Sequence, residues 1–220
     1  RNAALTNNFY STGQVCSHGT RVFVQRGVYD EFLAGLTERV GGLTVGDPFD
    51  PATEIGPLVS AEHHGKVMRY MQLALDSGAR HVVGGSVPDD PALAGGNYVT
   101  PSVFADCTDD MAFVTDEVFG PLMAVLPFDD ETEAVARANA TDYGLAGAVF
   151  SSDIARANRV ANAIQAGFVW INDYGTMPAT VPFGGYKHSG LGRENGEHAI
   201  EHYTQIKTIY TNLEPVERYL

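Results

Sequence analysis

The 220-residue chain has only two cysteines, Cys16 and Cys107, and they lie far apart in the sequence. Neither belongs to a C-x-x-C pair, so the sequence has neither a disulfide framework nor a cysteine zinc motif. The histidines at 63–64 and at 198 and 202 lack an H-E-x-x-H pattern and an evident third ligand, so we predict no metal site. A low cysteine content without disulfide spacing is typical of proteins in a reducing compartment, so we expect a cytoplasmic protein.

Long apolar runs and an excess of basic residues are also missing. No stretch approaches the roughly 18 to 20 apolar residues that a membrane helix needs, and the first ten residues lack the apolar core of a signal peptide. Fourteen basic and 27 acidic residues give a formal charge of -13. This charge argues against nucleic acid and anionic membranes as partners.

Strand-like and helix-like patterns alternate along the chain. Runs of β-branched residues predict strands, and apolar residues spaced by three or four predict helices. The predicted strands are 20–25, 79–85, 98–107, 121–128, 145–151 and 168–172, and the predicted helices between them are 28–43, 61–78, 131–140 and 153–164. We therefore predict an α/β fold with a mostly parallel twisted sheet flanked by helices. A short helix near 194–202 and an alternating segment at 203–213, typical of an edge or exchanged strand, complete the expected order.

Cys16 lies in the stretch STGQVCSHGTRVFVQ, directly before the first predicted strand. Free cysteine is among the most buried residue types, so a small buried side chain is the simpler interpretation. Polar neighbours and a glycine at position 13 favour a reactive thiol instead, which needs access and a lowered pKa. The local sequence leaves both interpretations open.

Two other stretches carry residues that suit a ligand site. Glu117 and Phe119 immediately precede the apolar run 121–128, where loops of α/β sheets line ligand crevices. Locally, a solvated glutamate and a core phenylalanine are the simpler interpretation. The loop PFGGYKHSGLGRENG has five glycines around Lys187, Arg193 and Glu194, but it matches neither a dinucleotide fingerprint nor a P-loop.

Taken in order, these stretches resemble the aldehyde dehydrogenase superfamily. GQVCS matches its catalytic cysteine motif, EVFGP its Glu-x-Phe-Gly-Pro motif, and PFGGYKHSGLGRENG its C-terminal signature. The resemblance runs from about residue 5 to 213 and is strongest to the branch that oxidises betaine aldehyde and trimethylaminobutyraldehyde. It implies a catalytic α/β domain over 1–204 and an oligomerisation strand and tail over 205–220.

The resemblance also implies the roles of individual residues. Cys16 would attack the aldehyde carbon, forming a thiohemiacetal and then a thioester, and its backbone N–H would help to hold the oxyanion. Glu117 would bind the nicotinamide ribose of NAD or NADP, and Phe119 would pack beside the nicotinamide. Tyr174 and Phe183 would line the substrate pocket, and Lys187 and Glu194 would lie near a polar, proton-conducting path. The partners implied are a small aldehyde and further copies of the chain in a dimer or tetramer.

The chain departs from the family pattern in what it lacks. The NAD-binding domain, the general-base glutamate and the oxyanion asparagine of the family are not among these 220 residues. We therefore expect the chain by itself not to bind the cofactor and to be inactive in aldehyde oxidation. Two alternatives stay open: a cofactor-independent thiol esterase with His18 as the base near Cys16, and a non-catalytic assembly fragment.

Overall fold

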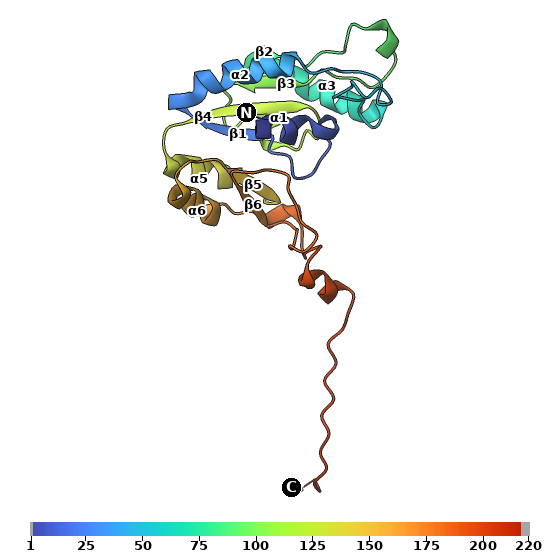
Figure 1. Ribbon diagram of the computed structural model, residues 1–220, viewed down its shortest axis with the longest axis vertical. Coiled ribbons are helices and arrows are strands. Elements are labelled where there is room, and N and C mark those ends of the chain that lie inside the picture. The colour runs from blue at the N-terminus through green and yellow to red at the C-terminus, as the bar shows by residue number, and fades with distance from the viewer. Residues whose placement is uncertain (1, 217–220) are drawn as a thin grey trace.

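The structure is a computed structural model that describes residues 2–216, and its strands and helices alternate as the sequence predicts (Figure 1). The strands are β1 (Arg21–Gln25), β2 (Arg80–Val83), β3 (Ser102–Ala105), β4 (Leu122–Phe128), β5 (Ala146–Val149) and β6 (Phe168–Ile171). The α-helices are α1 (Asn2–Phe9), α2 (Tyr29–Gly41), α3 (Ala61–Asp76), α4 (Ala112–Thr115), α5 (Glu131–Asn139) and α6 (Ile154–Ala163). The predicted helix near 194–202 is a 3-10 helix, Glu197–His202. Helices α1 and α4 were not predicted.

Side chains cap three of the helices at their first turn. Ser60 accepts a hydrogen bond from the His63 N–H at the start of α3. Asp130 caps α5 by accepting from the Glu133 N–H, and Asp153 caps α6. These caps satisfy N–H groups that have no partner within a helix.

The strands form two sheets, both mainly parallel. Four strands pair in the order β1-β4-β3-β2, in which β2 alone runs antiparallel, to β3. Strands β5 and β6 form a separate parallel pair. Arg21, at the start of β1, donates hydrogen bonds to the carbonyls of Arg137 and Ala138 at the end of α5. This contact ties the four-stranded sheet to the smaller unit of α5, α6, β5 and β6.

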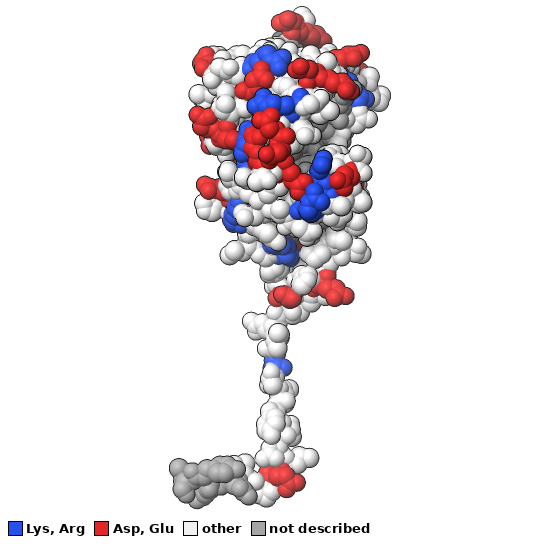
Figure 2. Space-filling model, turned by 90° about the vertical axis from the view of Figure 1, so that its left-hand side faces the viewer, with Lys and Arg blue, Asp and Glu red and all other residues white. Residues whose placement is uncertain are grey.

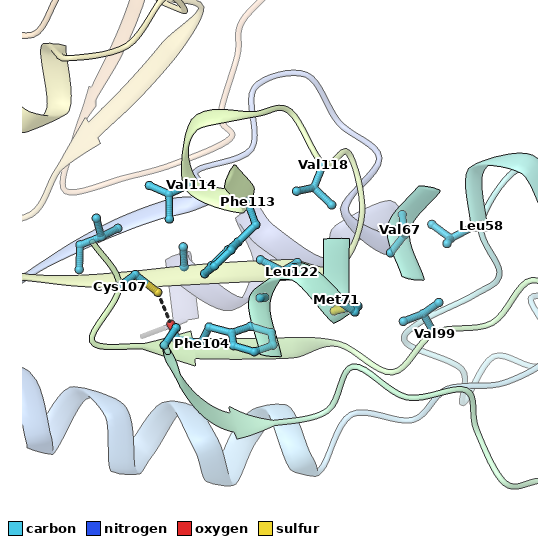
Figure 3. Packing of buried hydrophobic residues seen from close by; sticks show 14 residues of the cluster. Leu58, Val67, Met71, Val99, Phe104, Cys107, Phe113, Val114, Val118 and Leu122 are labelled. Carbon is cyan, nitrogen blue, oxygen red and sulfur yellow. Dashed lines mark hydrogen bonds between the residues drawn. The ribbon is translucent and has the colours of Figure 1, made fainter. Parts of the chain in front are cut away.

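Both faces of the four-stranded sheet are buried, and successive residues of β4 serve opposite faces. Leu122, Ala124 and Leu126 pack with α3 and α4, in the cluster that Figure 3 draws. Met123 and Val125 pack on the other face, against residues of α1 and α2. Burial on both faces explains the unbroken apolar run of this strand.

Cys107 belongs to the first of these clusters, where its thiol donates to the carbonyl of Phe104 (Figure 3). It is 2% exposed, and burial raises the pKa of its thiol to about 12. Cys107 is therefore a structural residue.

The segment after the 3-10 helix Glu197–His202 extends away from the body of the molecule (Figure 1). Within residues 203–216 the structure assigns no strand, and the side chains are exposed. The oligomerisation strand therefore stays a prediction, and residues 217–220 of the predicted tail lie outside the described range.

Figure 2 shows acidic and basic side chains interspersed over one face of the body. Ion pairs of the described chain include Arg137 with Asp109 and Arg159 with Glu131. Among residues 2–216, no helix combines the length and the apolar character needed to cross a membrane.

Candidate active site

Cys16 lies on a loop that begins with an unusual backbone turn. Ser11, Thr12 and Gly13 all have positive φ angles, of 51°, 57° and 76°. Two side-chain contacts hold this turn against the segment 56–59: the Thr12 hydroxyl donates to the Gly56 carbonyl at 3.0 Å, and the Gln14 side chain accepts from the Val59 N–H at 3.0 Å. Beyond this fixed turn, the Cys16 side chain is exposed. Exposure removes the buried-cysteine interpretation and leaves the thiol accessible.

The structure brings the Cys16 loop against the loop of Glu117 and Phe119. A Cβ atom built on Gly13 would lie 2.2 Å from the carbonyl oxygen of Gly120. Real Cβ atoms essentially never approach so closely, and φ is positive here as well, so only glycine fits without displacement. Two stretches about a hundred residues apart in the sequence therefore meet, backbone to backbone.

Helix α3 fixes the 116–120 loop from the other side. The ring of His63 hydrogen-bonds through Nε2 to the Phe119 carbonyl at 2.7 Å, and it meets the Phe119 ring edge-on. Lys66 donates to the Glu117 carbonyl at 2.8 Å. These bonds hold Phe119 in the left-handed region, at φ 59°.

The Glu117 side chain itself is exposed, while its backbone is anchored. Among the described residues, no hydrogen bond or ion pair occupies its carboxylate. Both oxygens are therefore free to accept from a ligand, and they suit the two hydroxyls of a ribose. A free carboxylate on an anchored backbone is compatible with the ribose contact that the resemblance implies for Glu117, and this contact stays a prediction.

Tyr174 connects the smaller sheet to the Cys16 loop. Its hydroxyl donates to the Ser17 carbonyl at 2.7 Å, and its ring stacks on Trp170 of β6 at 4.7 Å between centroids. The Phe168 ring lies near the rings of Trp170 and Phe183, with centroid distances of 4.4 and 6.1 Å. A row of aromatic rings thus runs from the glycine-rich loop to the residue next to Cys16.

The glycine-rich loop folds back on itself. The N–H and C=O groups of Phe183 and Glu194 exchange two hydrogen bonds of 2.7 Å, and Arg193 donates to the carbonyls of Gly185 and Gly192. Part of this loop lines a hollow of about 300 Å³ that also reaches His202. Phe183 is thus held at the root of the loop, and the Glu194 side chain is exposed.

Lys187 lies next to the end of helix α5. Its Nζ donates to the carbonyls of Asn139 and Thr141, just after the last turn of α5. A cation suits this position because helix C-termini carry partial negative charge. No hydrogen bond or ion pair within residues 2–216 joins Lys187 to Glu194, so their shared proton path stays a prediction.

His18 is partly buried near Asn8. Burial lowers the pKa of His18 to about 4, against the opposing effect of a hydrogen bond to the Asn8 backbone. Its Nδ1 atom is buried without a hydrogen-bond partner. Within the described chain no hydrogen bond joins His18 to Cys16, so the structure does not supply the contact that a thiol esterase would need.

His63 and Lys66 are the site residues that sequence reasoning missed. His63 was weighed only as a metal ligand, yet its ring holds the Phe119 carbonyl. Over residues 2–216, His, Cys, Asp and Glu side chains form no group of three or more that could hold a metal ion. Residues 63, 66, 67 and 70 are spaced to lie on one face of a helix, which indicates that they contact the same neighbouring segment. The spacing does not indicate that this segment is the 116–120 loop.

Comparisons with known proteins show the family of the chain. Residues 1–209 match the sequence profile of the Aldehyde dehydrogenase family. The chain is 52% identical to betaine aldehyde dehydrogenase 1 of Rhizobium meliloti over 97% of its own length, and 54% identical to a betaine aldehyde dehydrogenase of Cereibacter sphaeroides over 98%. In both cases it spans 44% of the length of the relative.

Solved structures give the same result. Betaine aldehyde dehydrogenase from Staphylococcus aureus in complex with NAD+ superposes with a TM-score of 0.96 at 44% identity, over 99% of this chain and 43% of that one. Its P449M variant has been solved with NAD+ and with a cysteine modified by β-mercaptoethanol (BME). The profile match covers nearly the whole chain, so this protein belongs to the aldehyde dehydrogenase family.

Proposed function

We propose that this chain supplies the nucleophile and part of the cofactor and substrate sites of an NAD-dependent aldehyde dehydrogenase acting on betaine aldehyde or a related aminoaldehyde. The observation that carries the proposal is an exposed Cys16 on a loop that is packed, through Gly13 and Gly120, against the anchored loop of Glu117 and Phe119. The betaine aldehyde dehydrogenases that are 52% and 54% identical to the chain in sequence support this class of substrate.

In the first step, the Cys16 thiolate attacks the aldehyde carbon. A sulfur–carbon bond forms, the carbonyl π electrons move to oxygen, and the alkoxide takes a proton from water to give a thiohemiacetal. The Cys16 backbone N–H would donate to this oxygen; one such donor contributes roughly 3 to 4 kcal/mol to the transition state in comparable enzymes.

The cofactor site needs a free acceptor, and Glu117 provides one. The exposed carboxylate would accept from the ribose hydroxyls, while Phe119 would pack beside the nicotinamide. NAD+, when bound, supplies the acceptor for the hydride that leaves the substrate carbon. As the hydride leaves, the thiohemiacetal hydroxyl returns its proton to water, so that Cys16 holds the acyl group as a thioester. Attack by water then breaks the carbon–sulfur bond, which releases the carboxylic acid and a proton and restores the thiolate.

The substrate contacts are proposed from aromatic residues. A quaternary ammonium group is attracted to ring faces, each contact contributing roughly 0.5 to 2 kcal/mol. Phe183, packed on Phe168, and Tyr174, packed on Trp170, are the aromatic residues of the proposed pocket. Lys187 and Glu194 remain proposed for a polar path, and the segment 203–213 for contact with another copy of the chain.

Protection of the thiol tests the first step. Iodoacetamide labels Cys16 and Cys107 of the 220-residue chain, and peptide mass spectrometry measures each rate with and without betaine aldehyde. We expect the aldehyde to protect Cys16 reversibly and to leave the slow labelling of Cys107 unchanged. Choline, which has the ammonium group but no carbonyl, is the matched control and should protect little. Equal protection by choline, or none by the aldehyde, would contradict the proposal.

A further inference from the structure

The residue after the proposed nucleophile is held by a side chain 157 positions further along the sequence. The Tyr174 hydroxyl donates a 2.7 Å hydrogen bond to the Ser17 carbonyl. The Ser17 carbonyl belongs to the Ser17–His18 peptide group, whose N–H donates to the Val15 carbonyl at 3.1 Å. The Val15 carbonyl shares its peptide group with the Cys16 N–H, so the contact acts on the backbone that carries the thiol. It also joins the segment after β6 to the Cys16 loop, which precedes β1 of the other sheet.

The donor is itself rigidly placed. The Tyr174 ring stacks on Trp170 with an interplanar angle of 22°, and Trp170 is 6% exposed. The Trp170 indole N–H donates in turn to the Thr176 carbonyl at 2.7 Å, which fixes the turn that carries Tyr174. Burial raises the pKa of the Tyr174 phenol above its usual range, so the hydroxyl keeps its proton and remains a donor.

The receiving loop is shaped to accept this ring. A Cβ atom on Gly19 would lie only 3.1 Å from the Tyr174 ring and hydroxyl, so a glycine at this position lets the tyrosine approach. The Gly19 N–H donates to the Asn7 carbonyl at 3.1 Å, and the His18 N–H donates to the Val15 carbonyl. The loop is therefore held on both sides of the Ser17 carbonyl.

We propose that Tyr174 is a positioning residue. Through the Ser17–His18 peptide group, whose N–H is hydrogen-bonded to the Val15 carbonyl, it fixes the peptide plane of the Cys16 N–H and thereby aims this N–H at the developing oxyanion. The inference rests on the function proposed above. An oxyanion donor is effective only when its direction is set before the reaction, because reorientation during the reaction costs free energy. Tyr174 thus acts on aldehyde addition through the backbone, separately from any contact between its ring and the substrate.

Two variants test this role on the 220-residue chain. Tyr174→Phe removes the hydroxyl and keeps the ring stack, and Gly19→Ala pushes a methyl group against the same ring. Tyr203→Phe, at a tyrosine that is 78% exposed, is the matched control. For each protein, the assay measures the iodoacetamide rate at Cys16 without aldehyde and the betaine aldehyde concentration that gives half-protection. Thermal unfolding verifies that each variant is folded.

Loss of one neutral hydrogen bond should raise the half-protecting aldehyde concentration about fivefold to tenfold in Tyr174→Phe. Displacement of the ring by a few tenths of an ångström should raise it by a smaller factor in Gly19→Ala, and Tyr203→Phe should not raise it. The iodoacetamide rate should stay within about twofold of wild type, because alkylation needs only an accessible thiolate and no oxyanion donor. A loss of structure alone would change both quantities together.

The outcomes separate the two proposals. Protection of wild type combined with unchanged half-protection in either folded variant would overturn the role of Tyr174 and leave the proposed function standing. Absence of protection in wild type itself would overturn the proposed function, and the role of Tyr174 with it. If Tyr174→Phe does not fold, the half-protecting aldehyde concentration of Gly19→Ala tests the role of Tyr174.

Discussion

The α-carbon of Gly13 lies so close to the carbonyl of Gly120 that a Cβ atom at position 13 would be 2.2 Å from that oxygen. This approach joins the loop of Cys16 to the loop of Glu117 and Phe119. The two loops can lie this close together only because residue 13 is a glycine, which has no Cβ atom. The first prediction follows from this contact.

Substitution of Gly13 by alanine should destabilise the chain by about 2 to 4 kcal/mol, because the methyl group overlaps a backbone carbonyl and φ is positive. Chemical denaturation measures the free energy of unfolding. Gly27→Ala is the control, since a Cβ there meets no atom within 4 Å, and we expect its effect to stay within about 0.5 kcal/mol. Equal stability of the two variants would refute the close approach.

His63 should stabilise the 116–120 loop through its bond to the Phe119 carbonyl. In His63→Ala, we expect the backbone amides of this loop to exchange about fivefold faster with solvent, which corresponds to the loss of one hydrogen bond. His63→Gln, which keeps an N–H donor, should exchange more slowly than the alanine variant. Hydrogen exchange with mass spectrometry measures these rates, with the exposed His198→Ala as control. Wild-type rates in His63→Ala would show that α3 does not anchor the loop.

His18 should make stability depend on pH. Burial lowers its pKa to about 4 in the folded chain, from 6.5 in an ordinary histidine, so the unfolded state binds more protons between these values. Stability is therefore fully present above pH 6.5 and falls as the pH drops towards 4. Because His18 is only partly buried, we expect its contribution to be about 1 to 2 kcal/mol.

The measurement compares urea unfolding at several pH values in wild type and in His18→Gln, which does not titrate. The difference in unfolding free energy between the two should change between pH 6.5 and 4, in favour of the variant at the acid end. His188→Gln, which removes an exposed histidine, is the matched control. Parallel curves for wild type and His18→Gln would mean that His18 is not desolvated.

The secondary structure could be predicted where local physics determines it. The apolar run of β4 is continuous because both of its faces are buried, and Ser60 and Asp130 mark helix starts by capping them. Helix α1 escaped prediction because asparagines at 7 and 8 are poor helix formers, and its packing depends on distant residues such as Val125. The alternating segment 203–213 resembles a strand, but a strand needs a partner for its backbone groups, and the described chain offers none.

The sequence proposes residues for the site, but it does not predict their contacts. The order of the motifs indicated Cys16, Glu117 and Phe119, since each carries a side chain suited to one task. Which backbones touch depends on how distant loops pack, so the bond between Tyr174 and Ser17 has no local signal in the sequence. For the same reason, the anchoring role of His63 became visible only with the fold.

Direct observation of the bond between Cys16 and an aldehyde tests the central claim most sharply. Betaine aldehyde labelled with ¹³C at the carbonyl is added to the chain, and NMR follows the labelled carbon. We predict a new signal for a carbon bonded to both sulfur and a hydroxyl group, which is lost in Cys16→Ser and retained in Cys107→Ser. No such signal in wild type, or an equal signal in Cys16→Ser, would contradict the assignment of Cys16 as the nucleophile.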